Sequence, residues 1–190
     1  MDGESLEDNV KQMLSNVSNE LAKIEVKEKV KSSYYLFFNN TMILSAAQLK
    51  KNNCYENILL LSHECVHSIQ KRLLHVLNFI LANIEIILFI VCIVMNFITG
   101  QIGFDIKILY ITVCILSILI RYYMEIQAVI KGVVLADQNI REKETAGKII
   151  EWKQKLRKYK CKQLITFPLF ILYLFGIKII RLMIIIYLPK

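Results

Sequence analysis

The apolar residues of this 190-residue chain gather in three long blocks and are sparse elsewhere. The blocks run from about Leu73 to Thr99, from about Phe104 to Met124 and from about Leu164 to Leu188. At about 1.5 Å of rise per residue, helices of this length can cross a hydrocarbon core of roughly 30 Å. Three buried helices of a soluble protein are the alternative, but so few polar residues would leave them without a solvent-facing side. The pattern therefore predicts about three transmembrane helices.

The few charges inside these blocks predict an internal contact. Glu85 lies well inside the first block, and Lys178 and Arg181 lie inside the third. Lone charges at such depth in a membrane are costly and are usually paired. We expect Glu85 to face Lys178 or, failing that, Arg181. The alternative is that both cations reach out to the interface and Glu85 is protonated.

The 72 residues before the first block have the pattern of a small α+β unit. Between Ser5 and Ile24, apolar residues recur at helical spacing on one face. Residues 24–30, 34–38 and 41–44 have the pattern of strands, with a turn signal at Asn39-Asn40. A second helix is then expected to run through Gln70.

The positions of Lys and Arg predict how the chain is threaded through the membrane. Residues 1–72 hold 9 of them and residues 121–163 hold 11, whereas residues 73–120 hold 1. Because basic residues concentrate on the cytoplasmic side, we expect both basic segments there, with two crossings between them. The predicted organisation is a cytoplasmic α+β unit (1–72), a transmembrane hairpin (73–124), a basic cytoplasmic helical segment (125–163) and a third transmembrane segment (164–190).

Composition and charge narrow the class of protein and its partners. With 55% hydrophobic residues, the chain is not a disordered tail, and its five scattered cysteines suit neither a disulfide framework nor a CxxC zinc site. Much of the net charge of +8 comes from residues 141–162. That run also holds acidic residues and abuts a predicted span, which favours contact with anionic membrane lipid over nucleic acid. Trp152 and Tyr159 within it suit a membrane interface.

The N-terminal unit contains a motif typical of metal-dependent enzymes, H-E-x-x-H, in the sequence His63-Glu64-Cys65-Val66-His67. Two histidines four residues apart project from one helical face, so their nitrogens can converge on one ion. Neutral imidazole is a preferred ligand of zinc, and this spacing supplies half of a tetrahedral site. Glu64 is placed to act as a general base toward a water that the metal activates. The alternative, a helix with two surface histidines, is disfavoured by the apolar residues around them, because a buried histidine pair needs a partner.

A third ligand has to come from elsewhere in the chain. The metzincin pattern would need a histidine at Leu73 and a glycine at Gln70, so it does not apply. His75 is one candidate. The better candidate is Glu125, which follows the second apolar block on the cytoplasmic side, where an ionisable residue is by default a functional hypothesis. Its alternative role is an interfacial ion pair with a neighbouring Arg121 or Lys131.

These residues resemble a known family, the membrane neutral zinc metallopeptidases of the YugP type. Residues 61–70 (Leu-Ser-His-Glu-Cys-Val-His-Ser-Ile-Gln) are similar to its A-H-E-x-G-H-A-I-Q signature. Residues 125–128 (Glu-Ile-Gln-Ala) resemble its E-F-D-A stretch after the second span, which implies Glu125 as the third ligand. The likeness covers about residues 33–185. Val66 stands where the family has Gly, and Gln127 where it has Asp.

The predicted fold is an α-helical membrane protein with about three transmembrane helices and a small cytoplasmic α+β, zincin-like H-E-x-x-H unit. His63, His67 and Glu125 would hold Zn²⁺, and Glu64 would be the catalytic base. The predicted function is a gluzincin-like zinc metallopeptidase. It would lie in a bacterial-type cell membrane, with its active site on the cytoplasmic side, and cut peptide or membrane-protein substrates.

Two further points accompany this prediction. Residues 34–44 would supply an edge strand that binds an extended peptide through its main chain, and either Tyr122 or Tyr123 is a candidate donor to the oxyanion. The alternative function is a non-catalytic membrane scaffold that binds zinc for structure. Glu64 disfavours the scaffold, since a structural zinc site has no use for a base there.

Overall fold

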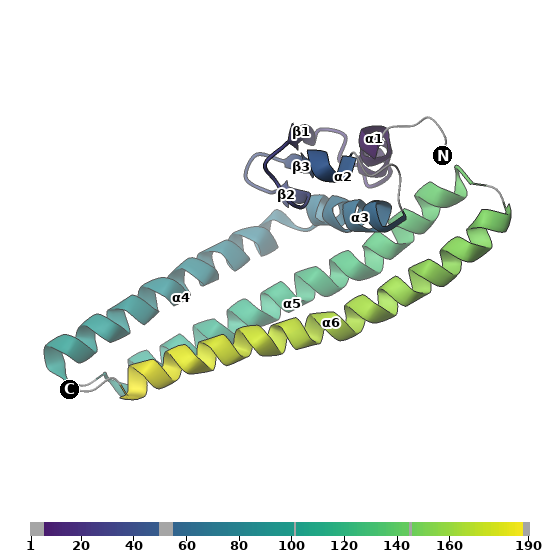
Figure 1. Cartoon of the computed structure of the whole chain (residues 1–190). Coiled ribbons are helices and arrows are strands. Elements are labelled where there is room, and N and C mark those ends of the chain that lie inside the picture. Colours follow the sequence, from purple (N-terminus) through teal and green to yellow (C-terminus); the bar gives the residue numbers. More distant parts are fainter. Residues whose placement is uncertain (1–5, 50–54, 101, 145, 188–190) are drawn as a thin grey trace. The chain divides into compact units, whose positions relative to one another are not determined.

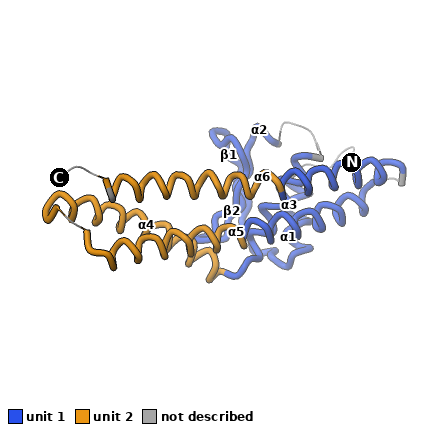
Figure 2. Tube along the Cα trace, turned by 90° about the horizontal axis from the view of Figure 1, so that it is seen from below, with its two compact units in different colours: residues 1–71, 124–164 blue, residues 72–123, 165–190 orange. Residues whose placement is uncertain are grey.

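The computed structural model describes residues 6–49, 55–100, 102–144 and 146–187, and most of them are helical (Figure 1). The chain divides into two compact units (Figure 2). Unit 1 comprises Met1–Lys71 and Met124–Leu164, and unit 2 comprises Arg72–Tyr123 and Ile165–Lys190. The first part of unit 1 contains α1 (Leu6–Asn16), β1 (Lys23–Lys27), β2 (Tyr34–Leu36), β3 (Thr41–Ser45), α2 (Ala46–Leu49) and α3 (Tyr55–Ile69). Unit 2 contains α4 (Arg72–Thr99), and both units share α5 (Phe104–Arg141) and α6 (Ala146–Tyr187).

The three expected strands form one mixed sheet in the order β1-β3-β2. β1 runs parallel to β3, with Lys23 opposite Thr41, and β2 runs antiparallel to β3, with Tyr35 opposite Met42. Every residue of the central strand β3 is buried. The β2–β3 connection ends at Asn40, whose φ of 49° lies in the left-handed region that Asn tolerates. The turn signal at Asn39-Asn40 is therefore confirmed.

The first helix is shorter than its apolar periodicity predicts, because it ends at Asn16 and not near Ile24. Ser18 adopts a φ of 59°, its N–H bonds the carbonyl of Ser15, and the N–H of Asn19 bonds the carbonyl of Leu14. This pair of hydrogen bonds is a Schellman motif, which terminates a helix. Glycine is the usual residue at this position of the motif, so the serine gave no indication in the sequence that the helix ends here.

The hydrophobic core of unit 1 draws on the sheet and on four helices. Its buried members include Met13 from α1, Met42 from β3, Cys65 from α3, Ala136 from α5 and Trp152 from α6. Trp152 is 0% exposed, and Tyr159 packs partly buried against the same core. Trp152 therefore packs in the protein core and is not exposed to lipid, while the expected interfacial position of Tyr159 stays a prediction. The basic segment 125–163 forms the end of α5 and the start of α6, and the apolar sides of both pack inside unit 1.

Unit 2 has the surface expected of membrane-spanning helices. Among the described residues, two helices are long and apolar enough to cross a membrane, Arg72–Thr99 and Gly147–Ile185. The second of these begins far before Leu164, because α6 runs without a break from the basic segment into the third apolar block. Large side chains such as Ile87, Phe97 and Leu172 are more than half exposed. So much exposed apolar surface is typical of contact with lipid or another protein.

The expected internal ion pair is present in unit 2. Glu85 on α4 accepts a hydrogen bond from Lys178 on α6. Its other oxygen lies 3.1 Å from Nη1 of Arg181. The Glu85 side chain is only 5% exposed, so both cations serve to compensate a buried carboxylate. Cys92 and Cys114 in this unit, like Cys65 and Cys161 in unit 1, are free thiols, and Cys54 lies outside the described residues.

Candidate metal centre

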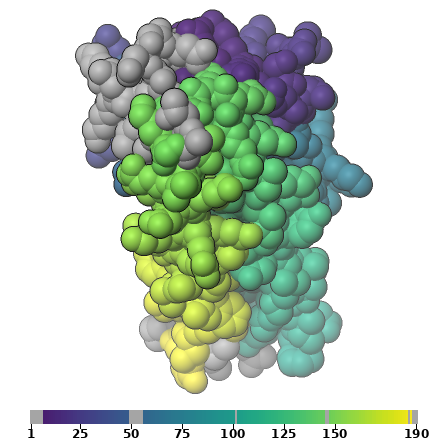
Figure 3. All heavy atoms as spheres, turned by 90° about the vertical axis from the view of Figure 1, so that its right-hand side faces the viewer, coloured from purple at the N-terminus to yellow at the C-terminus, as the bar shows by residue number. Residues whose placement is uncertain are grey.

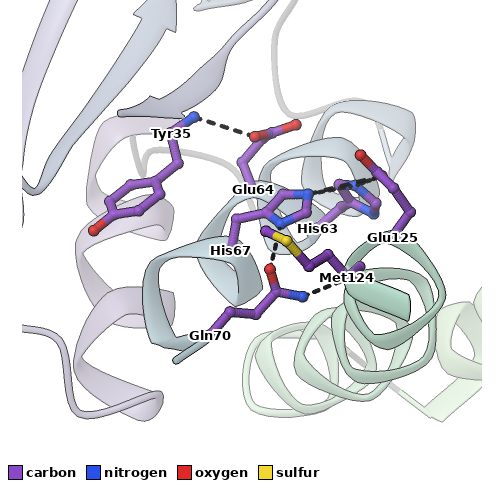
Figure 4. A network of polar contacts seen from close by, with 7 residues as sticks. All are labelled: Tyr35, His63, Glu64, His67, Gln70, Met124 and Glu125. Carbon is purple, nitrogen blue, oxygen red and sulfur yellow. Dashed lines mark hydrogen bonds and ion pairs between the residues drawn. The ribbon is translucent and has the colours of Figure 1, made fainter. Parts of the chain in front are cut away.

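His63 and His67 lie one turn apart on α3 and point toward the same place (Figure 4). The helix is anchored by neighbours such as Leu61 and Cys65, which are buried in the core. The two imidazoles remain at the edge of that core, with side chains 14% and 13% exposed. Their Nε2 atoms are 3.1 Å apart. The spacing in the sequence therefore produces the convergence that a shared ion requires.

Glu125 on α5 brings a carboxylate to the same point. Its Oε2 lies 3.2 Å from Nε2 of His63 and 3.8 Å from Nε2 of His67. The candidate ligand atoms of the three residues all lie within 4.8 Å of one another. All three residues belong to unit 1. The structure thus brings together the three residues that were predicted from the sequence to be metal ligands. His75, the alternative third ligand, lies on α4 in unit 2.

The donor set and its spacing fit a zinc ion. Two imidazole nitrogens and one carboxylate oxygen form a known catalytic zinc site, with one position left for water or substrate. Donors at about 2.05 Å from a tetrahedral ion would be about 3.3 Å apart. The observed distances from His63 to His67 and to Glu125 are 3.1 and 3.2 Å, while the distance from His67 to Glu125, 3.8 Å, is about half an ångström too long. A small adjustment of the Glu125 side chain would close that gap.

Gln70, just beyond the end of α3, orients one of the histidines. Its Nε2 donates to the main-chain carbonyl of Met124 at 2.6 Å, so its Oε1 is the atom that faces Nδ1 of His67 at 2.8 Å. Because a carbonyl oxygen only accepts, Nδ1 of His67 carries the proton and its Nε2 keeps a lone pair for a metal. Gln70 also ties the end of α3 to the residue next to Glu125. Sequence reasoning missed this role, although the residue lies three positions after His67.

A glycine lets α5 approach α3 closely enough to bring Glu125 there. A Cβ added to Gly132 would lie 3.0 Å from the Cα and 3.1 Å from the N of His63. Gly132 lies seven residues, or about two helical turns, after Glu125, so both residues are on the same side of α5. A lone glycine inside a helix often marks a place where another main chain packs closely. Gly132 was therefore the feature of the sequence that could have indicated this contact.

Glu64 is held beside the histidines by the sheet. Its Oε2 accepts a hydrogen bond from the N–H of Tyr35 on β2 at 3.2 Å. β2 lies at the edge of the sheet, where alternate main-chain groups point away from the neighbouring strand. Burial raises the pKa of the Glu64 carboxyl to about 7, while His63 and the N–H of Tyr35 act in the opposite direction. The sequence motif marked Glu64, but not the main-chain donor that orients it.

Tyr159 on α6 lies in the same unit as the three candidate ligands. Burial, followed by the charge of Glu64, raises the pKa of its phenol, Glu125 adds to the effect, and a hydrogen bond with Gln163 acts in the opposite direction. The two tyrosines proposed as oxyanion donors belong to unit 2, where Tyr122 stacks on Phe167 with ring centroids 5.9 Å apart. Tyr159, in contrast, belongs to unit 1, as do Tyr34 and Tyr35.

Comparisons of the chain with protein-family models, with curated proteins and with solved structures find no match. The resemblance to the YugP-type family therefore stays a prediction.

Proposed function

We propose that this protein is a membrane-anchored zinc metallopeptidase that cuts peptides on the cytoplasmic side of the membrane. The observation that supports this most is the convergence of His63, His67 and Glu125 within 4.8 Å, with Glu64 next to the first histidine. A structural zinc site is usually closed by four protein ligands, whereas three ligands and a nearby carboxylate are typical of hydrolases. We propose three membrane spans, made by α4, the first part of α5 and the second part of α6.

The catalytic roles follow from the chemistry of these side chains. A bound zinc would supply Lewis acidity, which lowers the pKa of a water and polarises a peptide carbonyl. Glu64 would take the proton from the attacking water and return it to the amine that leaves. The N–H of Tyr35 would keep one carboxylate oxygen of Glu64 in place, so that the other faces the water.

The substrate would be an extended peptide presented close to the bilayer. The outer edge of β2 is not paired with another strand among the described residues, so its main-chain groups other than the N–H of Tyr35, which bonds Glu64, can align a peptide by hydrogen bonds. Only a few residues separate His67 from the start of α4, and Glu125 directly follows the second apolar block. A membrane-tethered or newly released apolar peptide would therefore reach the site at a high effective concentration.

Replacing Glu64 tests the proposal, because it separates a peptidase from a zinc scaffold. Glu64→Gln keeps the size of the side chain and removes the base, so zinc should stay bound while hydrolysis falls by roughly 10²–10⁴-fold. The assay would follow cleavage of membrane-anchored and short apolar peptides in lipid nanodiscs. Glu56→Gln, an exposed carboxylate in the first turn of the same helix, is the matched control and should keep full activity. Equal activity of zinc-loaded wild type and Glu64→Gln would reject the peptidase and favour the scaffold.

A further inference from the structure

A second candidate site lies in unit 1, lined by none of the metal-centre residues. It is a groove of about 610 Å³ between α5 and α6. Figure 3 shows the face on which the two helices, coloured teal to green and green to yellow, run next to each other. The groove has an apolar part made by Val133, Val134 and Leu156. Its α6 wall carries Lys153, Arg157 and Lys160, which are spaced by four and three residues and so lie on one stripe of the helix.

The charges around the groove are unbalanced. Asp137 is its acidic residue, and it already accepts a hydrogen bond from Nε of Arg141 at 2.7 Å. That leaves Lys153, Arg157 and Lys160 without an acidic partner among the residues that the structure describes. Other lysines of this region do have one, for example Lys155 with Glu151 at 2.7 Å. Three unpaired cations beside an apolar surface are complementary to a ligand that carries both a negative charge and an apolar part.

The position of the groove along α6 indicates where such a ligand comes from. Lys160 precedes the third apolar block at Leu164 by four residues in a continuous helix, and Lys153 precedes it by eleven. At 1.5 Å per residue these distances are about 6 and 16 Å. The headgroup layer reaches about 5–8 Å beyond the hydrocarbon core, so Lys160 lies at the height of a lipid phosphate and Arg157 and Lys153 lie further out on the same stripe. Basic pockets beside spans are known to bind acidic headgroups.

We propose that the α5–α6 groove is a binding site for an anionic phospholipid, with the phosphate held by Lys153, Arg157 and Lys160. The apolar part of the groove receives the glycerol backbone and the first carbons of an acyl chain. The inference rests on the membrane placement in the proposed function and is independent of peptidase activity. It goes beyond a general attraction of basic residues to lipid, because it requires these three cations and not their neighbours.

The chain offers a matched control on the same helix. The groove variant is Lys153→Gln/Arg157→Gln/Lys160→Gln, and the control variant is Lys155→Gln/Lys158→Gln/Lys162→Gln. Both remove three positive charges from exposed positions of α6, but no residue of the control lines the groove. The purified full-length protein would be reconstituted in phosphatidylcholine bilayers, and the association of spin-labelled phosphatidylglycerol and phosphatidylcholine would be compared. Thermal unfolding would check that the variants fold, and the single Arg157→Gln variant would replace the triple if it does not.

Wild type should prefer phosphatidylglycerol about tenfold, the control should keep most of that preference, and the groove variant should lose it. Equal losses in both triple variants, or no preference in wild type, would overturn the site in favour of general electrostatic attraction. Displacement of the labelled lipid by soluble polyglutamate would overturn it in favour of an acidic peptide, and displacement by millimolar inorganic phosphate in favour of a soluble phosphate. Failure of the protein to float with vesicles would refute the membrane placement and this inference together. A protein that inserts, prefers the lipid and cuts no peptide would refute the peptidase alone.

Discussion

Gly132 of α5 lies against the main chain of His63 on α3, at a distance where even a methyl group would make a tighter contact than side chains normally do. A methyl group there would lie 3.0 Å from the Cα and 3.1 Å from the N of His63. Main-chain atoms inside a helix cannot rotate away as a flexible side chain can, so the helices themselves would have to move apart by a few tenths of an ångström. Because Glu125 lies two turns earlier on the same side of α5, that separation would also move the proposed third ligand away from the histidines.

Gly132→Ala should therefore weaken metal binding without changing any ligand. Overpacking of this kind typically costs about 1–3 kcal/mol of folding stability. We expect zinc affinity to fall by at least about tenfold as Glu125 is displaced, measured by competition with a fluorescent chelator. Gly147→Ala is the matched control, because a Cβ at Gly147 would meet nothing within 4 Å and alanine is the better helix former by up to about 1 kcal/mol. The explanation would fail if both variants bound zinc as wild type does.

Removing the ligands one at a time should strip the metal. Purified protein should hold about one zinc per chain, and His63→Ala, His67→Ala and Glu125→Ala should each lose it, since two remaining ligands hold zinc weakly. Elemental analysis of the purified variants would measure the metal content. His75→Ala is the control and should keep a full complement. If Glu125→Ala retained zinc while His75→Ala lost it, the third ligand would be His75.

Gln70 should matter for the metal although it does not touch it. Gln70→Leu removes the acceptor of the His67 Nδ1 proton and the link to the carbonyl of Met124. Partners that orient a ligating histidine typically contribute 10–100-fold to metal affinity, so we expect a loss in that range. Gln70→Glu keeps an acceptor for Nδ1 and should bind zinc more tightly than Gln70→Leu. Similar affinity of both variants and wild type would show that His67 is oriented by other contacts.

Two cysteine positions test how the chain is threaded. Among the described cysteines only Cys161 is exposed, because Cys65, Cys92 and Cys114 are buried. With Cys54 replaced by serine, a membrane-impermeant maleimide should label Cys161 only after the cytoplasmic face is opened. Gly103→Cys, at an exposed position before α5, should be labelled from outside in intact cells. Labelling of both positions from the same side would contradict the predicted topology.

Much of the local structure follows from patterns that the sequence displays directly. The H-E-x-x-H spacing alone was enough to predict that His63 and His67 share a face of α3, and the apolar blocks were enough to predict the long helices. Glu85, Lys178 and Arg181 lie deep inside the apolar blocks, and this position was enough to predict correctly that the two cations contact Glu85. These predictions succeed because they depend either on the spacing of residues within one helix or on the large free-energy cost of an unpaired charge in an apolar environment.

The contacts that arrange the centre depend on how separate elements meet, and periodicity does not report them. Nothing in the strand pattern of residues 34–38 indicated that the N–H of Tyr35 would bond Glu64. The basic residues around Trp152 in the sequence suggested a position at the membrane interface, but its side chain on α6 is buried in the core of unit 1. The Schellman end of α1 was hidden because Ser18 takes the position that glycine usually occupies.

Glu85 should be more important for folding than any exposed charge of unit 2. Glu85→Ala would leave Lys178 and Arg181 without their carboxylate, and the loss of one partner from a buried ion pair typically costs about 3–5 kcal/mol. Thermal unfolding in detergent micelles would show this as a large drop in Tm. Asp105→Ala, which removes the exposed acid in the first turn of α5, is the matched control and should change stability little. The triple replacement of Glu85, Lys178 and Arg181 by leucine should recover most of the lost stability, because an apolar cluster needs no compensating charge. A triple variant as unstable as Glu85→Ala would show that the loss comes from packing around Glu85 and not from the two unpaired cations.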